Sequence, residues 1–131
     1  MSAIYMTSTT PATVSAGGTL PITVTRRVGT NIISGTNSVI LRKPGYYQIT
    51  ATVTFTAAEA GDVTIEARKN NVAIPGITST ATVTTATTEV NTLSLTGIVR
   101  VFCYEGDAIL TLVNNSETAI DITNVSLSII D

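Results

Sequence analysis

The chain has 131 residues, of which 44% are hydrophobic and 12% are charged, and its formal net charge is −2 at pH 7. This length fits one domain, and the few basic residues are dispersed along the sequence, so we expect no nucleic-acid partner. The apolar residues come in short runs broken by threonine, well below the about 20 consecutive residues of a membrane-spanning helix. We therefore also expect a soluble chain with no membrane partner.

The N-terminal stretch 1–18 is rich in Ser, Thr, Ala and Gly and ends at Gly17-Gly18. Because this composition is typical of flexible tethers, we predict a flexible N-terminal arm over 1–18 and a folded domain over 19–131. The same stretch has neither a basic start nor an apolar centre, so we expect no secretory signal.

The sequence beyond the arm predicts strands, and the clearest lies within 44–56. Apolar side chains from Tyr47 to Phe55 alternate there with glutamine and threonines, which is the period of a strand with one buried face. Pro44-Gly45 marks its start, since proline has no amide to donate to a ladder. We interpret this segment as the central strand of the fold.

Other segments show the same period less clearly. Val63, Ile65 and Ala67 alternate with polar residues, and both faces of 91–104 are partly apolar. Gly, Pro and Asn residues separate the segments, as expected of turns. Besides the central strand, the predicted strands are 20–26, 32–33, 38–42, 63–69, 72–74, a weak strand within 78–88, 91–104, 108–113 and 120–130.

No segment has a helical period, and about eight to ten short strands joined by turns predict an all-β antiparallel sandwich or jelly roll. Periodicity alone does not choose between these two topologies. The side chains expected in the core share the apolar phase of their strands: Tyr47, Ile49, Val53, Phe55, Val63, Ile65, Leu95, Val99, Val101, Leu110, Leu112, Val125, Leu127 and Ile129.

The sequence offers little for catalysis. Histidine, the commonest general base and metal ligand, is absent, and the close acidic pairs Glu59/Asp62 and Glu105/Asp107 fall at predicted turns. We therefore predict no enzymatic activity, no cofactor and no metal. The alternative, a calcium site built from Asp62, Glu105 or Asp107, needs further oxygen ligands from several loops.

Cys103, the single cysteine, follows the apolar phase of its strand and is expected to be a small buried hydrophobe.

Three motifs occur in an order that resembles a known superfamily. Pro44-Gly45-Tyr46-Tyr47 opens the central strand, the run VRVFCY leads into Glu105-Gly106-Asp107 and AILTLV, and an apolar strand follows at 120–131. This order resembles the tumour necrosis factor and complement globular-head superfamily over 19–131. The resemblance implies a jelly roll that assembles as a trimer.

The resemblance also implies where the subunits meet. Ile98 and Phe102 lie on the second face of 91–104, which a monomeric sandwich normally leaves to polar side chains. In the superfamily the corresponding face forms the wall toward the neighbouring subunits; the alternative is a few exposed apolar residues without consequence. The predicted trimer-interface residues are Tyr46, Gln48, Thr50, Ile98, Arg100, Phe102, Ser128 and Ile130.

Free-standing members similar to this threonine-rich chain occur among bacteriophage virion proteins and bacterial spore-surface proteins. The collagen-like Gly-X-Y stalk of the spore-surface type is absent here. We therefore predict a non-enzymatic structural protein of a bacteriophage virion, such as a capsid decoration, head fibre or tail component. It would form a homotrimer and bind other virion proteins through the N-terminal arm.

The alternative function is a receptor- or glycan-binding tip domain of a phage or bacterial surface appendage. Loops 57–62, 70–80 and 114–119 would then contact a receptor on the host surface. These loops contain no tryptophan or tyrosine, the rings against which sugars usually stack, and this weakens the alternative.

Overall fold

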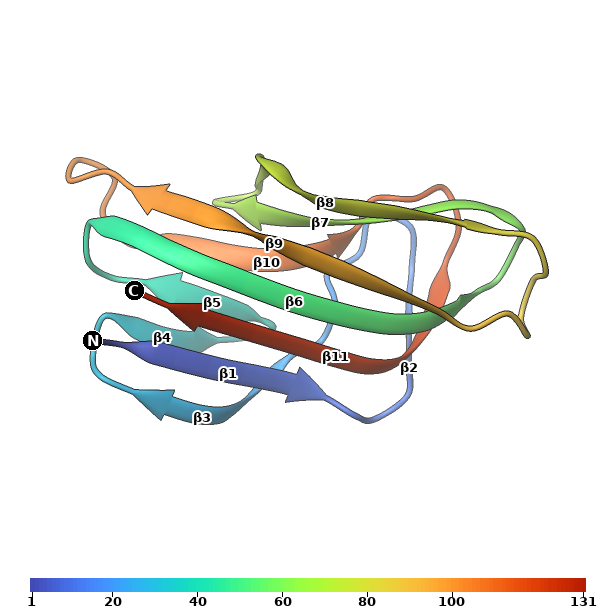
Figure 1. The fold of residues 1–131 in the computed structure, drawn as a ribbon, viewed down its shortest axis with the longest axis horizontal. Coiled ribbons are helices and arrows are strands. Elements are labelled where there is room, and N and C mark those ends of the chain that lie inside the picture. The colour runs from blue at the N-terminus through green and yellow to red at the C-terminus, as the bar shows by residue number, and fades with distance from the viewer.

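The computed structural model describes residues 1–131 and consists of two antiparallel β-sheets packed face to face (Figure 1). Sheet A contains β1 (Ala3–Ser8), β2 (Ala12–Val14), β3 (Thr23–Val28), β6 (Gly45–Ala57), β9 (Asn91–Val101) and β11 (Ile120–Ile130). Sheet B contains β4 (Ile32–Gly35), β5 (Ser38–Leu41), β7 (Gly61–Lys69), β8 (Val72–Val83) and β10 (Ala108–Asn114). None of the elements is a helix long and apolar enough to span a membrane.

The strand order is that of a jelly roll. Sheet A has the order β3-β1-β11-β6-β9, with β2 paired to the first part of β11, and sheet B has the order β4-β5-β10-β7-β8. From β6 onward the chain crosses repeatedly between the sheets, so that β6 and β11, far apart in sequence, lie side by side in sheet A (Figure 1). The predicted all-β antiparallel jelly roll in a single domain is confirmed, with eleven strands.

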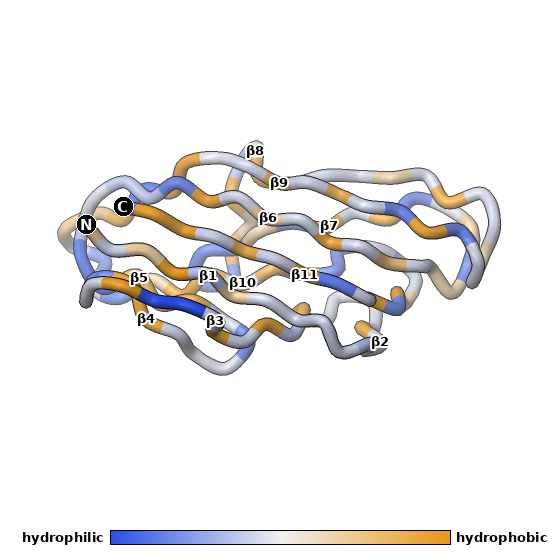
Figure 2. Tube along the Cα trace, turned by 60° about the horizontal axis from the view of Figure 1, so that its bottom comes forward, coloured by the Kyte–Doolittle hydropathy of each residue, from blue (hydrophilic) through white to orange (hydrophobic).

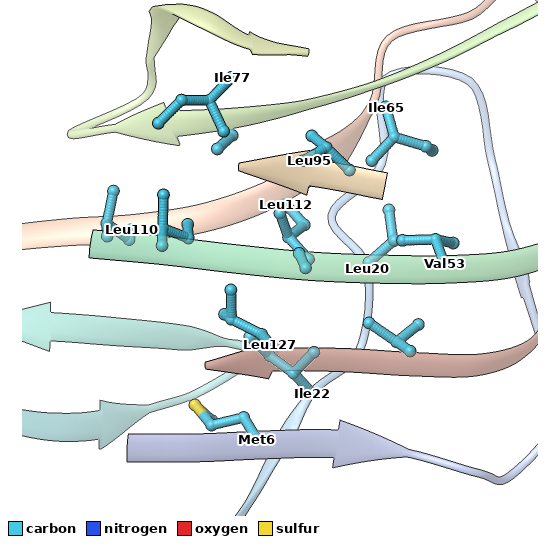
Figure 3. Close-up of a cluster of buried hydrophobic side chains, with 14 of the residues drawn as sticks. Met6, Leu20, Ile22, Val53, Ile65, Ile77, Leu95, Leu110, Leu112 and Leu127 are labelled. Atoms are coloured by element: carbon cyan, nitrogen blue, oxygen red, sulfur yellow. The ribbon is translucent and has the colours of Figure 1, made fainter. Parts of the chain in front are cut away.

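The core follows the alternation read from the sequence. Along β6 every second side chain from Tyr47 to Ala57 is buried, and the side chains between them remain at least partly exposed. Leu95 and Leu127 of sheet A and Leu112 of sheet B belong to one buried hydrophobic cluster between the sheets (Figure 3). All the side chains expected in the core are buried: Tyr47, Ile49, Val53, Phe55, Val63, Ile65, Leu95, Val99, Val101, Leu110, Leu112, Val125, Leu127 and Ile129.

The N-terminal residues belong to this core. β1 lies between β3 and β11 and pairs with β11 along its whole length, and its Ile4 and Met6 side chains are 2% and 0% exposed. The flexible arm predicted for 1–18 is therefore wrong for these residues, and the folded domain includes residues before 19. The physical reason is that the edge of β11 supplies hydrogen-bond partners to a Ser/Thr-rich segment whose own apolar pattern is too short to predict a strand.

The connection between β2 and β3 is also fixed in place. Asn114 of β10 is fully buried, and its Nδ2 donates to the carbonyl oxygens of Val14 (3.3 Å), Ser15 (3.2 Å) and Thr118 (3.1 Å). The Gly17 amide donates to the Asn114 carbonyl (2.8 Å). The connection thus leaves sheet A, is hydrogen-bonded along β10 of sheet B, and returns to sheet A at β3, so it is not a loose tether.

The two chain ends lie side by side at one end of the sandwich (Figure 1). The Ser2 amide donates to Asp131 Oδ1 (2.8 Å), and the Asn31 side-chain amide donates to Asp131 Oδ2 (3.1 Å). The Asp131 amide donates in return to the Ser2 carbonyl (3.1 Å). These contacts hold the pKa of the Asp131 carboxyl below its usual range, chiefly through the Ser2 amide and then through Asn31.

The strand predicted at 91–104 ends at Val101, as β9. The chain turns there, and the Glu105 amide donates to the Phe102 carbonyl (3.1 Å) across the turn. The turn begins before strand alternation can bring Cys103 inward, so the cysteine is exposed. Its predicted burial is wrong.

β8 joins the predicted segment 72–74 and the first part of 78–88 into one strand. Its register against β7 shifts in the middle, so that residues 74–77 bulge out without partners on β7. The bulge carries the Ile77 side chain over Gly97 of β9, where an added Cβ would lie 2.6 Å from Ile77 Cγ1. Glycine at this position therefore lets the edge strands β8 and β9 approach closely and close the sandwich.

Removal of residues 1–18 should unfold the domain. The truncated chain would expose the edge of β11 and lose the buried side chains of Ile4, Met6 and Val14. Each such side chain contributes about 1.5–3 kcal/mol when fully buried, against a total of about 5–15 kcal/mol for a domain. Thermal melting followed by circular dichroism should show no cooperative transition. A truncated chain that melts at the temperature of the full chain would contradict the placement of β1.

Gly97→Ala should lower the free energy of unfolding by about 1–3 kcal/mol, the usual cost of overpacking. The added methyl group would collide with the Ile77 side chain, so the same substitution should cost less in an Ile77→Ala background. Urea unfolding of the four proteins of this double-mutant cycle measures the coupling. An equal cost in both backgrounds would show that the two positions do not meet.

Candidate functional site on the outer face of sheet A

The outer face of sheet A brings together five of the eight residues predicted at the trimer interface. Gln48 of β6 lies between Ile98 of β9 and Ile130 of β11, and Thr50 lies opposite Ser128 in a neighbouring row. Because alternate residues of a strand point to the same face, these side chains share the surface opposite the core. None of them is buried.

Apolar side chains are exposed in these rows. Ile98 is 67% exposed and Ile130 is 45% exposed. β1 and β3 continue the rows with Tyr5, which is 41% exposed, and Val28, which is 55% exposed. We refer to the surface formed by Tyr5, Val28, Gln48, Thr50, Ile98, Ser128 and Ile130 as the assembly face.

The sequence reasoning missed Tyr5 and Val28. Tyr5 lay in the predicted arm, and Val28 lay just beyond the strand predicted at 20–26. The alternation of Tyr5 with the buried Ile4 and Met6 was the available signal, but it spans only three residues. β3 also places Arg26 and Arg27 beside the apolar end of β11, so this border of the assembly face is basic (Figure 2).

Farther along the strands, the same side of sheet A is lined by hydroxyl groups. Thr52 Oγ1 and Ser126 Oγ lie 2.5 Å apart, and Thr54 Oγ1 and Thr92 Oγ1 lie 3.1 Å apart. These cross-strand hydrogen bonds satisfy the hydroxyl groups within one chain. The outer side of the sheet is therefore divided into an apolar part near the chain ends and a polar part beyond it.

The other three predicted residues, Tyr46, Arg100 and Phe102, form a second group at the end of β9. Arg100 Cζ lies 5.4 Å from the centre of the Tyr46 ring and 4.4 Å from the centre of the Phe102 ring. Tyr104 continues the series, because its ring stacks on Phe102 with a centroid distance of 5.4 Å and an interplanar angle of 15°. We refer to these four side chains as the aromatic column. It borders the assembly face where Tyr46 and Ile98 line one shallow depression.

Glu105 fixes the turn that carries the aromatic column. Its Oε1 accepts a hydrogen bond from the Phe102 amide (2.7 Å), and its Oε2 pairs with Lys69 Nζ (3.0 Å). Lys69 Nζ also donates to the Arg100 carbonyl (2.9 Å). These contacts hold the pKa of the Glu105 carboxyl below its usual range, first through the Phe102 amide and then through Lys69.

Of the acidic residues considered for calcium, Asp62 lies far from Glu105. Asp62, near the start of β7, accepts a hydrogen bond from Thr82 Oγ1 (2.8 Å), whereas Glu105 is paired with Lys69 at the end of β7. The seven residue steps from Asp62 to Lys69 correspond to roughly 23 Å along a strand. No three acidic or cysteine side chains are grouped so that they could hold a metal ion.

Comparison with known proteins identifies the fold. Neither a protein-family model nor a curated protein matches the chain. Murine APRIL is a similar solved structure, with 10% identity, a TM-score of 0.69 and 97% coverage of both chains. The globular domain of zebrafish complement 1qA protein has 8% identity and a TM-score of 0.65, over 98% of this chain and 95% of that one.

The chain has the jelly-roll fold that these solved structures share. This confirms the resemblance read from the three sequence motifs. A phage protein has a similar structure: PRD1 vertex protein P5 is 18% identical, with a TM-score of 0.58, over 100% of this chain and 74% of that one. At these identities the likeness to the superfamily establishes the fold.

Glu105→Gln should loosen the turn at neutral pH. Because the folded chain depresses the pKa of Glu105, its ionised form adds stability above the pKa of an unfolded glutamate, and this contribution is lost as pH falls through the depressed value. Calorimetry should find a lower thermal midpoint for Glu105→Gln at neutral pH and a shrinking difference toward acid. Glu59→Gln, at an exposed carboxylate in a turn, is the control. A difference that stays constant with pH would show that ionised Glu105 does not stabilise the turn.

Proposed function

We propose that the chain is a non-enzymatic structural protein of a bacteriophage virion that assembles as a homotrimer through the assembly face. One observation carries the proposal: Tyr5, Val28, Ile98 and Ile130 are exposed in neighbouring rows, although the inner sides of the same sheet already fill a complete core. Isolated exposed apolar residues are normal on a protein surface, but a contiguous group marks an interaction site.

The position of the apolar residues favours a ring. Ile98 lies on β9, at one border of sheet A, and Tyr5 and Val28 lie on β1 and β3, at the other border. When one border of a subunit packs on the opposite border of the next, the contact is heterologous, and it closes into a ring if the rotation allows. A closed trimer, the state implied by the superfamily resemblance, would cover every copy of the assembly face.

The likeness to PRD1 vertex protein P5 along the whole chain supports a place in a virion. Because β1 is built into sheet A, attachment to other virion proteins would use a folded surface instead of the N-terminal arm expected from the sequence. A capsid decoration, a head fibre and a tail component would each satisfy this requirement. The lack of histidine and the engagement of Glu105 by Lys69 support a role without catalysis.

Ile98→Asp should dissociate the trimer. In the assembled protein the new carboxylate would be buried without a partner, at a cost of about 3–5 kcal/mol per site. Light scattering at micromolar concentration should find three times the 13.6 kDa chain mass for the unmodified protein and the chain mass for the variant. An unmodified protein that is monomeric under these conditions would refute the assembly.

Ile109→Asp is the matched control. Ile109 is 46% exposed and lies in β10, on the outer side of sheet B, away from the assembly face. This variant should keep the trimeric mass and the thermal midpoint of the unmodified protein. Dissociation by both substitutions would place the interface elsewhere or show a general loss of stability.

The virion role is tested on particles. Antibodies raised against the purified chain should label intact particles of the phage whose genome encodes it, in a regular pattern under the electron microscope. Labelling confined to the lysed cell debris would contradict a structural role in the virion.

The alternative, a receptor- or glycan-binding tip, is favoured by one observation that lies outside the loops expected to bind. Tyr104, in the turn after β9, is 81% exposed and stacked on Phe102. Loops 57–62, 70–80 and 114–119 offer no comparable ring.

A further inference from the structure

The aromatic column presents a positive charge without a partner. The Arg100 guanidinium lies against the rings of Tyr46 and Phe102, yet it forms neither an ion pair nor a side-chain hydrogen bond with any residue of the chain. The neighbouring cation, Lys69, is already neutralised by Glu105. The five N–H donors of Arg100 are therefore held in position and remain available to an external anion.

We propose that the aromatic column binds an acidic oligosaccharide, with one sugar ring packed against Tyr104 and the carboxylate of a neighbouring unit paired with Arg100. A planar guanidinium pairs with a carboxylate through two parallel hydrogen bonds. The exposed Tyr104 ring offers an apolar face to the C–H groups of a sugar, and its hydroxyl has no partner within the chain and is free for a sugar hydroxyl. The inference does not rest on the proposed virion role.

A small depression next to Arg100 fits a single sugar unit. It is formed where the bulge of β8 stands beside β9, and its wall includes Lys69, Val72, Ile74, Pro75 and Ile98. Its volume is about 250 Å³, just below the about 300–1,000 Å³ of pockets that hold drug-sized ligands. A ligand that occupies this depression and also reaches Tyr104 is larger than one ring, so the site suits consecutive units of an acidic polysaccharide.

The charge pattern disfavours a nucleic acid strand. Stacking on aromatic rings and contact with arginine also occur in proteins that bind single strands. Such proteins line a groove with several cations to follow the phosphates, whereas Arg100 is the one unpaired cation of the column and the chain has a net charge of −2. One free guanidinium matches one carboxylate on a sugar unit.

The turn is rigid enough to serve as a binding surface. Glu105 accepts a hydrogen bond from the Phe102 amide and pairs with Lys69, and Lys69 donates to the Arg100 carbonyl, so the backbone that carries the rings and the guanidinium is fixed by contacts within the chain. Rigid aromatic side chains lose little conformational entropy when a ligand binds.

Titration calorimetry of the full chain tests the site with glucuronic acid-rich oligosaccharides, with glucose oligosaccharides of equal length as the neutral probe. The acidic probe should bind and the neutral probe should not, and added salt should weaken the binding. Tyr104→Ala and Arg100→Gln should each weaken the affinity by about tenfold or more, as expected for the loss of a hydrogen bond to a charged group or of a stacked ring. Arg42→Gln, at an exposed arginine outside the column, should leave the affinity unchanged.

Three results would overturn the inference. One is that the acidic and neutral probes bind equally well, or that neither probe binds. Another is tighter binding of a single-stranded oligonucleotide than of the acidic saccharide. The last is dissociation of the assembly by Arg100→Gln in light scattering, which would make Arg100 an interface residue. The trimer is judged by the mass of the unmodified protein in light scattering, and the saccharide site by Tyr104→Ala and Arg100→Gln in calorimetry, so each proposal has its own measurement.

Discussion

The two-sided pairing of β6 is the constraint on which the rest of the structure depends. β6 pairs with β9 on one side and with β11 on the other, over nearly its whole length. Because side chains of a strand alternate between two faces, this register sends Tyr47, Val53 and Phe55 into the core and Gln48 to the outer face. A shift by one residue would exchange the two sets and lose both surfaces at once.

The same register explains how two surfaces with different chemistry arise on neighbouring strands. Where β1, β11, β6 and β9 lie side by side, the outer residues form a partly apolar face. Near the end of β9, Arg100 still lies opposite Tyr46 of β6, and the chain turns just beyond it with the Tyr104 ring exposed. The aromatic column thus begins on the last residues of β9, beside the assembly face, and continues into the turn that follows.

Long alternating segments were predictable from the sequence, and contacts between distant segments were not. The buried phase of β6, from Tyr47 to Phe55, and the apolar last strand gave both the fold class and most of the assembly face. β1 escaped prediction because Ile4 and Met6 are too few to establish a period, and only the edge of β11 makes them a strand. The packing of Ile77 over Gly97 depends on a register shift that no local pattern encodes. The stacking of Arg100 against Tyr46 and Phe102 could not be predicted either, because it requires the folded turn.

The hydrogen bonds between Ser2 and Asp131 have a consequence for engineering. A peptide fused before Ser2 and another fused after Asp131 would leave the domain from the same place, and a short linker between the two residues would close the chain into a circle without bridging a long distance. New ends opened in the exposed turn at Asn70-Asn71, between β7 and β8, would then give a circular permutant with the sheet pairing intact. In a closed ring of three subunits, all fused peptides would emerge from one pole, which makes the domain a one-sided platform for displaying three copies of a chosen sequence.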